Sequence, residues 1–241
     1  MLYASVGFGG GSTYTALLVL NDTDYRILPS IALTCNILVV TGGLWRFYKA
    51  GLLNIKGTLP FLIASIPAAW LGGRFIISES LFIGLLGFTL LLSGLRLLFQ
   101  IEIQNEKPSP KRQHPLIPPI IGGGIGFIAG LVGIGGGIFL APILYFMKWG
   151  TARQIAAACC LFIFVNSISG LFGQLSKLNE TDYISLITPY WPLFPAVILG
   201  GQIGSYFATK SFNPYIIKRL TSILILYVAI RLLIRWIGLL G

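Results

Sequence analysis

The chain has 241 residues, of which 55% are hydrophobic and 10% are charged, and its mean hydropathy is +0.84. A soluble protein usually carries about 25% charged residues, so this composition excludes a soluble enzyme, a disordered protein and a disulfide-rich scaffold. The 17 Lys and Arg against seven Asp and Glu give a net charge of +10. In a membrane protein such an excess is typical of cytoplasmic loops, an interpretation that we favour over nucleic-acid binding.

Largely uncharged stretches predict eight membrane elements, because a span needs about 20 apolar residues. They cover residues 1–20, 27–45, 57–77, 80–100, 116–147, 154–175, 184–209 and 216–238. The predicted fold is therefore an all-α polytopic membrane protein. The polar stretch 101–115 is a predicted linker between a first repeat, 1–100, and a second repeat, 116–241. The cysteines lie in apolar stretches and are expected to be small buried side chains.

The two halves repeat four landmarks in the same order, at shifts of 126 to 135 residues. The landmarks are a glycine box (VGFGGG or VGIGGG), a following arginine, a PxxxLGG stretch and an Arg-Leu-Leu triplet. They stand at 6–11, Arg26, 67–73 and 96–98 in the first half, and at 132–137, Arg153, 195–201 and 231–233 in the second. Many secondary transporters are built by such an internal duplication.

The second glycine box lies in a segment of 33 residues, 115–147, that contains no Lys, Arg, Asp or Glu. One straight helix of that length would measure about 50 Å, much more than the bilayer core. Its middle, GLVGIGGG, is a poor helix former because each Gly costs about 1 kcal/mol relative to Ala. We expect two half-helices joined at Gly135, Gly136 and Gly137. The second half either continues across the membrane or turns back.

Charge counting separates these alternatives. If all eight elements cross the membrane, one face collects 10 Lys and Arg and the other collects 7. If both glycine elements are re-entrant, three crossings remain in each half, and the split becomes 12 to 5. The positive-inside rule favours the re-entrant arrangement. Three crossings per half also make the repeats inverted with respect to each other, as in transporters with broken helices near the midplane.

The duplicated glycine boxes are the main candidate binding site. A half-helix that begins after such a box presents backbone N–H groups and the positive end of its dipole, and glycine lets a ligand approach the backbone. Two such starts would make an anion site, whereas the alternative role of the glycines is close helix packing. The predicted substrate-binding residues are Gly9, Gly10, Gly11, Ser12, Thr13, Asn36, Arg74, Gly135, Gly136, Gly137, Asn166 and Gln174.

Several of these residues have a structural alternative. Asn36 and Asn166 are costly in a membrane helix, so each either bonds a neighbouring helix or binds substrate. Arg74 is the leading basic candidate for an anion contact, but snorkelling competes, and we expect Arg96 and Arg231 to snorkel as well.

No pattern in the chain predicts an enzyme. There is no nucleophile with a nearby base and no Cys/His cluster, so we expect no catalytic residue, cofactor or metal. The seven acids and His114 lie in or beside loops. This placement predicts export driven by the membrane potential, without a proton relay on the protein.

With these motifs the chain resembles the sulfite exporter (TauE/SafE-like) family of membrane permeases over nearly its whole length. The resemblance rests on both glycine boxes, both PxxxLGG stretches, residues 2–7, Arg153 before the alanines at 156–158, and the stretch 169–174. It implies a multi-pass permease of the cell (inner) membrane that moves sulfite, a sulfonate or a related organosulfur anion. A passive anion channel of the same fold and a membrane interaction protein without a substrate are the alternatives. The oligomeric state stays open.

One departure concerns the first glycine box. Only residues 1–5 precede it, whereas the 17 residues 116–132 lead into and open the second. Either translation starts further upstream or one limb of this element is mostly absent, which argues against a symmetric two-helix site.

Overall fold

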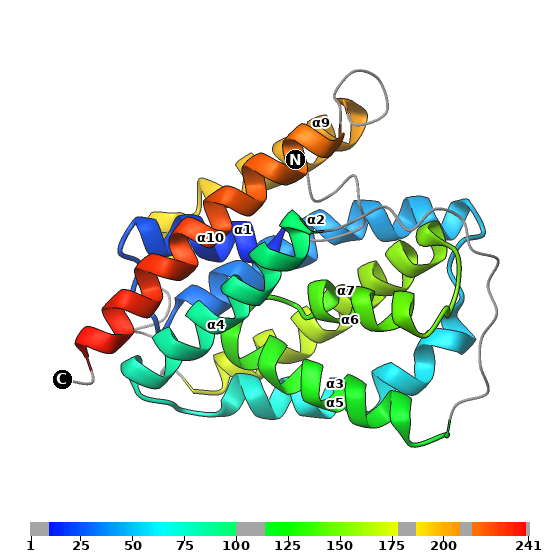
Figure 1. Ribbon diagram of the computed structural model, residues 1–241, viewed down its shortest axis with the longest axis horizontal. Helices are drawn as coiled ribbons and strands as arrows, with labels where there is room; N and C mark the ends of the chain where they lie inside the picture. The colour runs from blue at the N-terminus through cyan, green and yellow to red at the C-terminus, as the bar shows by residue number, and fades with distance from the viewer. Residues whose placement is uncertain (1–9, 100–113, 178–186, 208–213, 240–241) are drawn as a thin grey trace.

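The structure, a computed structural model, describes residues 10–99, 114–177, 187–207 and 214–239. Within these ranges every regular element is a helix (Figure 1), which confirms the predicted all-α class. The elements are α1 (Gly11–Leu20), α2 (Leu28–Lys49), α3 (Ile55–Arg74), α4 (Glu79–Leu98), α5 (Ile117–Val132), α6 (Gly137–Phe146), α7 (Ala152–Leu175), the short 3-10 turn η2 (Thr188–Tyr190), α9 (Leu193–Phe207) and α10 (Pro214–Gly238). Most of the predicted linker lies outside the described residues.

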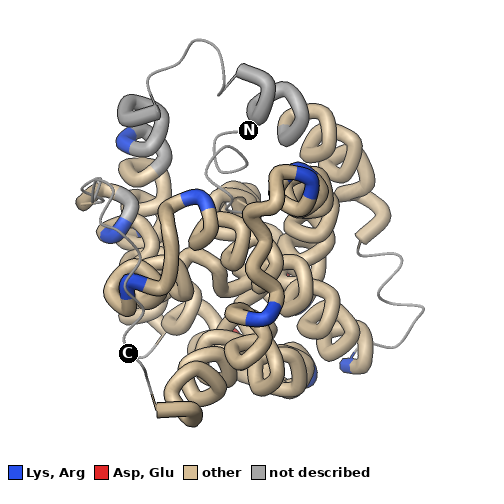
Figure 2. Tube along the Cα trace, turned by 90° about the vertical axis from the view of Figure 1, so that its right-hand side faces the viewer, with Lys and Arg blue, Asp and Glu red and all other residues tan. Residues whose placement is uncertain are grey.

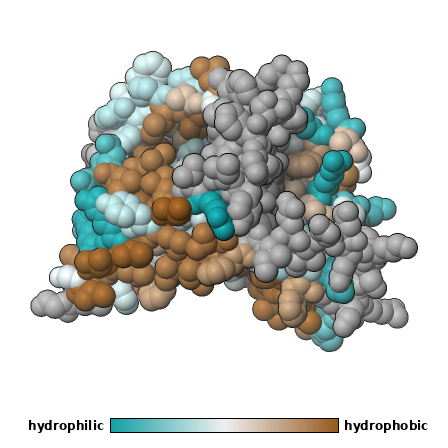
Figure 3. Space-filling view, turned by 45° about the horizontal axis from the view of Figure 1, so that its top comes forward, coloured by the Kyte–Doolittle hydropathy of each residue, from teal (hydrophilic) through white to brown (hydrophobic). Residues whose placement is uncertain are grey.

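Four of the described helices are long and apolar enough to cross a membrane: α2, α3, α7 and the Glu79–Arg96 part of α4. Polar caps fix where several of them begin. The side chain of Asn54 accepts the Gly57 N–H at 2.9 Å before α3, and Thr151 with Gln154 forms a capping box before α7. The outer surface exposes large apolar side chains (Figure 3), as a lipid-facing surface does.

Glycines bring α3 and α5 into close contact. Gly122, Gly126 and Gly130 recur every four residues along α5 and therefore share one face. The carbonyl groups that they face belong, in the same order, to Phe61, Ser65 and Ala69 of α3. A Cβ on Gly126 would lie 2.5 Å from the carbonyl oxygen of Ser65. The two helices therefore run parallel, with backbones closer than larger residues allow.

The chain turns back between α5 and α6. Near the start of α5, Gly122 lies against Phe61, in the first half of α3. Just after α6, the ring of Trp149 lies 2.8 Å from a Cβ built on Gly57, in the first turn of α3. The chain thus enters α5 and leaves α6 at the same end of α3, so the segment predicted at 116–147 is two helices that turn back on each other. This is the geometry of a re-entrant element, whose place in the membrane stays a prediction.

The other half-helix, α1, runs toward the opposite end of the bundle. Asp22, which follows α1, lies 4.0 Å from the guanidinium of Arg235, and Arg235 also contacts Glu79 at 3.0 Å. Glu79 begins α4, which follows α3 after a short connection. Therefore α1 ends near the C-terminal end of α3, whereas α6 ends near its N-terminal end. Inverted repeats would give α1 and α6 such opposite directions. The inverted relation of the two halves itself stays a prediction.

The charges of the described chain differ between the two ends. Figure 2 looks onto the end where α2 stops and α3 begins, and Lys and Arg stand out there. The three acids among the described residues, Asp22, Asp24 and Glu79, all line a pocket at the other end. The two ends therefore differ in charge in the direction that the 12-to-5 split of Lys and Arg predicts.

Candidate functional site

Two half-helices begin in the same way at equivalent positions of the glycine boxes. Gly10 precedes α1 with φ 83° and ψ 11°, and Gly136 precedes α6 with φ 78° and ψ −14°. Positive φ angles favour glycine, which has no Cβ to clash. No side chain caps either start. The positive ends of both helix dipoles are therefore built from glycine backbone.

The two helix starts meet at Asn36 of α2. A Cβ built on Gly11, the first residue of α1, would lie 2.5 Å from the carbonyl oxygen of Ile134 and 2.8 Å from Nδ2 of Asn36. The same Nδ2 is 3.2 Å from a Cβ built on Gly135 and 3.5 Å from the carbonyl oxygen of Gly133. Only residues without side chains permit this approach, so the two glycine boxes and Asn36 form one buried site.

Buried polar atoms without a partner surround this site. The side chains of Asn36 and Ser167 are 0% exposed, and Oγ of Ser167 lies 3.1 Å from a Cβ built on Gly135. Within the described residues, Oδ1 of Asn36, Oγ of Ser167 and Oγ1 of Thr13 accept and donate no hydrogen bond. An unpaired buried polar group costs about 1–3 kcal/mol, so their convergence indicates a place for a polar ligand. The glycine junction is defined as Gly10, Gly11, Asn36, Gly135, Gly136, Gly137 and Ser167.

Most of the predicted site residues lie at or beside the glycine junction. Ser12 is buried and Thr13 half-buried in the first turn of α1. Asn166 is buried, but its Nδ2 donates to the carbonyl oxygen of Phe162 on its own helix at 2.9 Å, and only its Oδ1 is unpaired. Gly9 lies outside the described residues.

Two predicted site residues are placed elsewhere. Nε2 of Gln174 donates to the carbonyl oxygen of Gly130 at 2.9 Å, so this side chain satisfies the last turn of α5. Arg74 is exposed at the end of α3, and its guanidinium lies 5.2 Å from the ring centroid of Trp70. The contact of Gln174 is a hydrogen bond between α7 and α5, and that of Arg74 agrees with snorkelling.

One residue of the junction, Ser167, and one neighbour of it, Arg96, were not predicted from the sequence. Ser167 follows Asn166, and adjacent helical residues point about 100° apart. Which of the two faces the junction depends on where the break between α5 and α6 lies against α7. Arg96 was expected to snorkel, but it is half-buried, and its Nη1 donates to the carbonyl oxygen of Ile138 in the first turn of α6. Its place in the repeated Arg-Leu-Leu triplet was the available signal.

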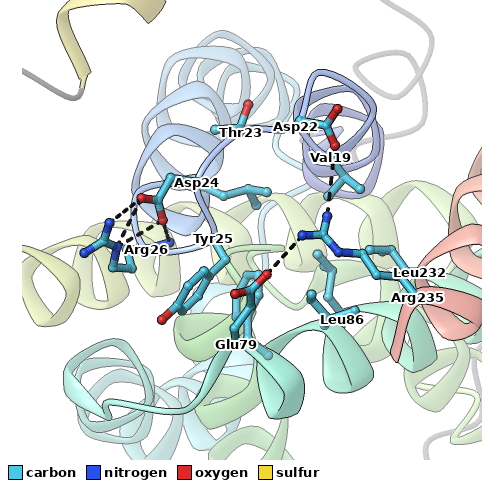
Figure 4. A pocket seen from close by; sticks show the side chains of 13 residues that line it. Val19, Asp22, Thr23, Asp24, Tyr25, Arg26, Glu79, Leu86, Leu232 and Arg235 are labelled. Atoms are coloured by element: carbon cyan, nitrogen blue, oxygen red, sulfur yellow. Dashed lines mark hydrogen bonds and ion pairs between the residues drawn. The ribbon is translucent and has the colours of Figure 1, made fainter. Parts of the chain in front are cut away.

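A separate pocket of about 540 Å³ opens between the ends of α1 and α10 (Figure 4) and contains no residue of the glycine junction. Nη2 of Arg26 lies 2.7 Å from Oδ2 of Asp24, and Nη2 of Arg235 lies 3.0 Å from Oε1 of Glu79. Hydrogen bonds from Arg26 lower the pKa of Asp24. Because these charges neutralise one another, the pocket is a weaker candidate for an anion than the junction.

The glycine junction can hold an anion by hydrogen bonding alone. The donors there are the backbone N–H groups that open α1 and α6, the Ser167 hydroxyl, and Nδ2 of Asn36, which also donates to the carbonyl oxygen of Gly133 at 3.5 Å. Among the described residues, no group of three His, Cys, Asp or Glu could hold a metal ion. The donors arrive from α1, α2, α6 and α7, so a ligand there would touch both halves of the chain.

Membrane-length helices, a helix pair that turns back on itself and a buried polar junction are the features of a multi-pass membrane transporter. The profile of the family described as "Sulfite exporter TauE/SafE" matches residues 1–232. The chain belongs to this family, which confirms the resemblance seen in the sequence.

Known relatives carry the same general description. The chain is 31% identical to the probable membrane transporter protein y4hK of Sinorhizobium fredii, over 97% of this chain and 93% of the relative. It is 26% identical to a probable membrane transporter protein of Haemophilus influenzae, over 95% and 90% of the two chains. For the probable membrane transporter protein YunE of Bacillus subtilis the identity is 22%, over 92% and 89%. No solved structure matches the chain significantly.

Proposed function

We propose that this protein moves a small sulfur-containing anion, sulfite or a sulfonate, across the cell (inner) membrane, and that the anion binds at the glycine junction. One observation carries the proposal: two uncapped, glycine-started helices meet around Asn36 and Ser167, and the buried Oδ1 of Asn36 and Oγ of Ser167 have no partner among the described residues. The description of the family supports a sulfur oxyanion as the substrate class.

The electrostatics of the junction suit a monoanion, which is the charge of a sulfonate or of hydrogensulfite, the protonated form of sulfite. Each helix start carries roughly half of a positive elementary charge, so two starts together balance one negative charge. Sulfite and sulfonates present three oxygen atoms, which can accept hydrogen bonds from donors on several helices at once. A site of backbone and neutral side chains also binds weakly enough to release its ligand, which transport requires.

The same placement supports transport driven by the membrane potential. Moving one charge across 100 mV is worth about 2.3 kcal/mol, which favours exit of a monoanion from a negative interior. The described acids lie beyond the far end of α1, about 15 Å from its start for a helix of ten residues. The glycine junction contains no acidic or basic side chain that could relay a proton, so electrogenic export is the expected mode.

The test is transport by an Asn36→Asp variant in liposomes. The substitution keeps the shape of the side chain but places a negative charge between the two helix starts. We expect the concentration of sulfite or methanesulfonate that gives half-maximal flux to rise at least tenfold, while the protein remains folded. Wild-type half-saturation in this variant would show that the anion binds elsewhere.

Asn54→Asp is the matched control. Asn54 is an exposed helix cap before α3, and aspartate caps a helix equally well, so flux should be unchanged. The same assay distinguishes a carrier from a passive channel, because carrier flux saturates with anion concentration and channel flux rises nearly linearly.

A further inference from the structure

A proline in α6 leaves one carbonyl group without its helical donor. Pro142 lies inside α6. In an α-helix the carbonyl of residue i accepts the N–H of residue i+4, so Ile138 should receive a hydrogen bond from residue 142, and proline has no N–H to give. Nη1 of Arg96 donates to this carbonyl oxygen instead, from α4 in the first half of the chain.

The other half-helix provides an internal comparison. The glycine boxes align at a shift of 126 residues, so Pro142 corresponds to Ala16 of α1. Ala16 has a backbone N–H, and α1 needs no outside donor at this position. Arg231, the counterpart of Arg96 in the repeated Arg-Leu-Leu triplet, is exposed. Of the two triplet arginines, the one that reaches into the bundle is therefore the one that contacts the half-helix whose backbone donor is missing.

The charge of Arg96 lies at an unusual end of a helix. Cations are normally stabilised near helix C-termini, because the N-terminus is already positive. Here a guanidinium lies beside the first turn of α6, directly after Gly136 and Gly137 of the glycine junction. A charged group within a membrane-spanning bundle is costly and marks a functional role. An anion bound ahead of Gly137 would offset both positive charges.

We propose that Arg96 is a positioning residue for transport: it replaces the backbone donor missing at Pro142 and so holds the start of α6, with its part of the glycine junction, against α4. This inference rests on the proposed function only for its transport readout. The hydrogen bond itself ties α6 to the first half of the chain whatever the substrate is.

The test is a double-mutant cycle between Arg96→Met and Pro142→Ala. Arg96→Met removes the donor, whereas Pro142→Ala supplies a backbone N–H to Ile138. Arg96→Met should raise the half-saturating anion concentration about tenfold and lower the thermal unfolding midpoint. Pro142→Ala added to Arg96→Met should restore most of both values. Arg96→Lys keeps one charged donor nitrogen, so its half-saturating concentration should stay within about threefold of wild type. Arg231→Met is the matched control and should leave both values unchanged.

Each result bears on the proposal separately from the anion site. If Arg96→Met behaves as wild type, or if Pro142→Ala fails to rescue it, the positioning role is wrong. If Arg96→Met does not fold, the double variant decides: a folded, transporting double variant supports the proposal and an unfolded one overturns it. If Pro142→Ala rescues the unfolding midpoint of Arg96→Met but the half-saturating concentrations do not change, Arg96 stabilises the contact between α4 and α6. Its role in transport would then be wrong.

Discussion

Single polar residues determine what the glycine junction can bind. Asn36 and Ser167 come from α2 and α7, and both converge on Gly135. The sequence marked Asn36 because an amide is costly in a membrane helix. It did not place Ser167 in the predicted site, because a serine hydroxyl can bond to its own helix backbone at little cost. Only the three-dimensional position of the break shows that Ser167 is unpaired.

Lys177 gives a prediction about pH at the same scale. It follows α7, its Nζ lies 3.2 Å from Oε1 of Gln174, and burial lowers its pKa from 10.5 to about 8. Between pH 8 and 10.5 the unfolded chain therefore binds more protons than the folded protein, so stability rises with pH there. Below pH 8 the full cost of burying the charge remains.

Lys177→Met should remove this dependence. We expect the thermal unfolding midpoint of wild type, measured relative to that of the variant, to be constant below pH 8 and to rise between pH 8 and 10. The Met variant should be the more stable protein at pH 7. Parallel pH profiles for the two proteins would mean that Lys177 titrates as an ordinary exposed lysine.

At the scale of elements, glycine has two separate roles in this protein. In the glycine boxes it provides positive φ at Gly10 and Gly136, before the two half-helices. Along α5 it lets the backbones of α3 and α5 approach, and there the φ angle is ordinary. The second role depends on which face of α5 meets α3, so the contacts of each glycine distinguish it from its neighbours.

Two alanine substitutions on α5 test this distinction. A Cβ on Gly126 would lie 2.5 Å from the carbonyl oxygen of Ser65, whereas one on Gly124 would meet nothing within 4 Å. Gly126→Ala should destabilise the protein by about 1–3 kcal/mol, because a packed interface must move apart. Gly124→Ala should be neutral or stabilising by up to about 1 kcal/mol. Thermal unfolding in detergent measures both, and equal effects would contradict the assigned packing face.

The sequence predicted the helical elements well, and it predicted the break between α5 and α6. Charge-free length and the glycine run are local signals, so one sequence suffices to read them. The replacement of the backbone donor missing at Pro142 by the Arg96 side chain was not predictable in this way. It depends on a contact between residues 42 positions apart, from Arg96 to Ile138. For the same reason Gln174 of α7 was predicted in the site, whereas its side chain bonds to a carbonyl group in the last turn of α5.

At the scale of the whole molecule, two half-helices begin at one buried point and run toward opposite ends. The Lys and Arg positions coloured in Figure 2 mark one end, and the pocket with the three described acids marks the other. A substrate at the glycine junction would therefore lie between two faces of different charge. In alternating access such a fixed central site opens to one face at a time.

The central claim is that the transported anion occupies the glycine junction, and thiol modification at Ser167→Cys tests it most directly. The background replaces Cys35, Cys159 and Cys160 by alanine, and Ser65→Cys, between α3 and α5, is the buried control. A small cationic methanethiosulfonate reagent should modify the thiol at position 167 but not at position 65. Methanesulfonate, which does not consume the reagent, should slow modification, with a half-effect at its half-saturating concentration for transport. If a transporting Ser167→Cys protein reacts equally fast at saturating anion, or never reacts, the anion does not bind at the glycine junction.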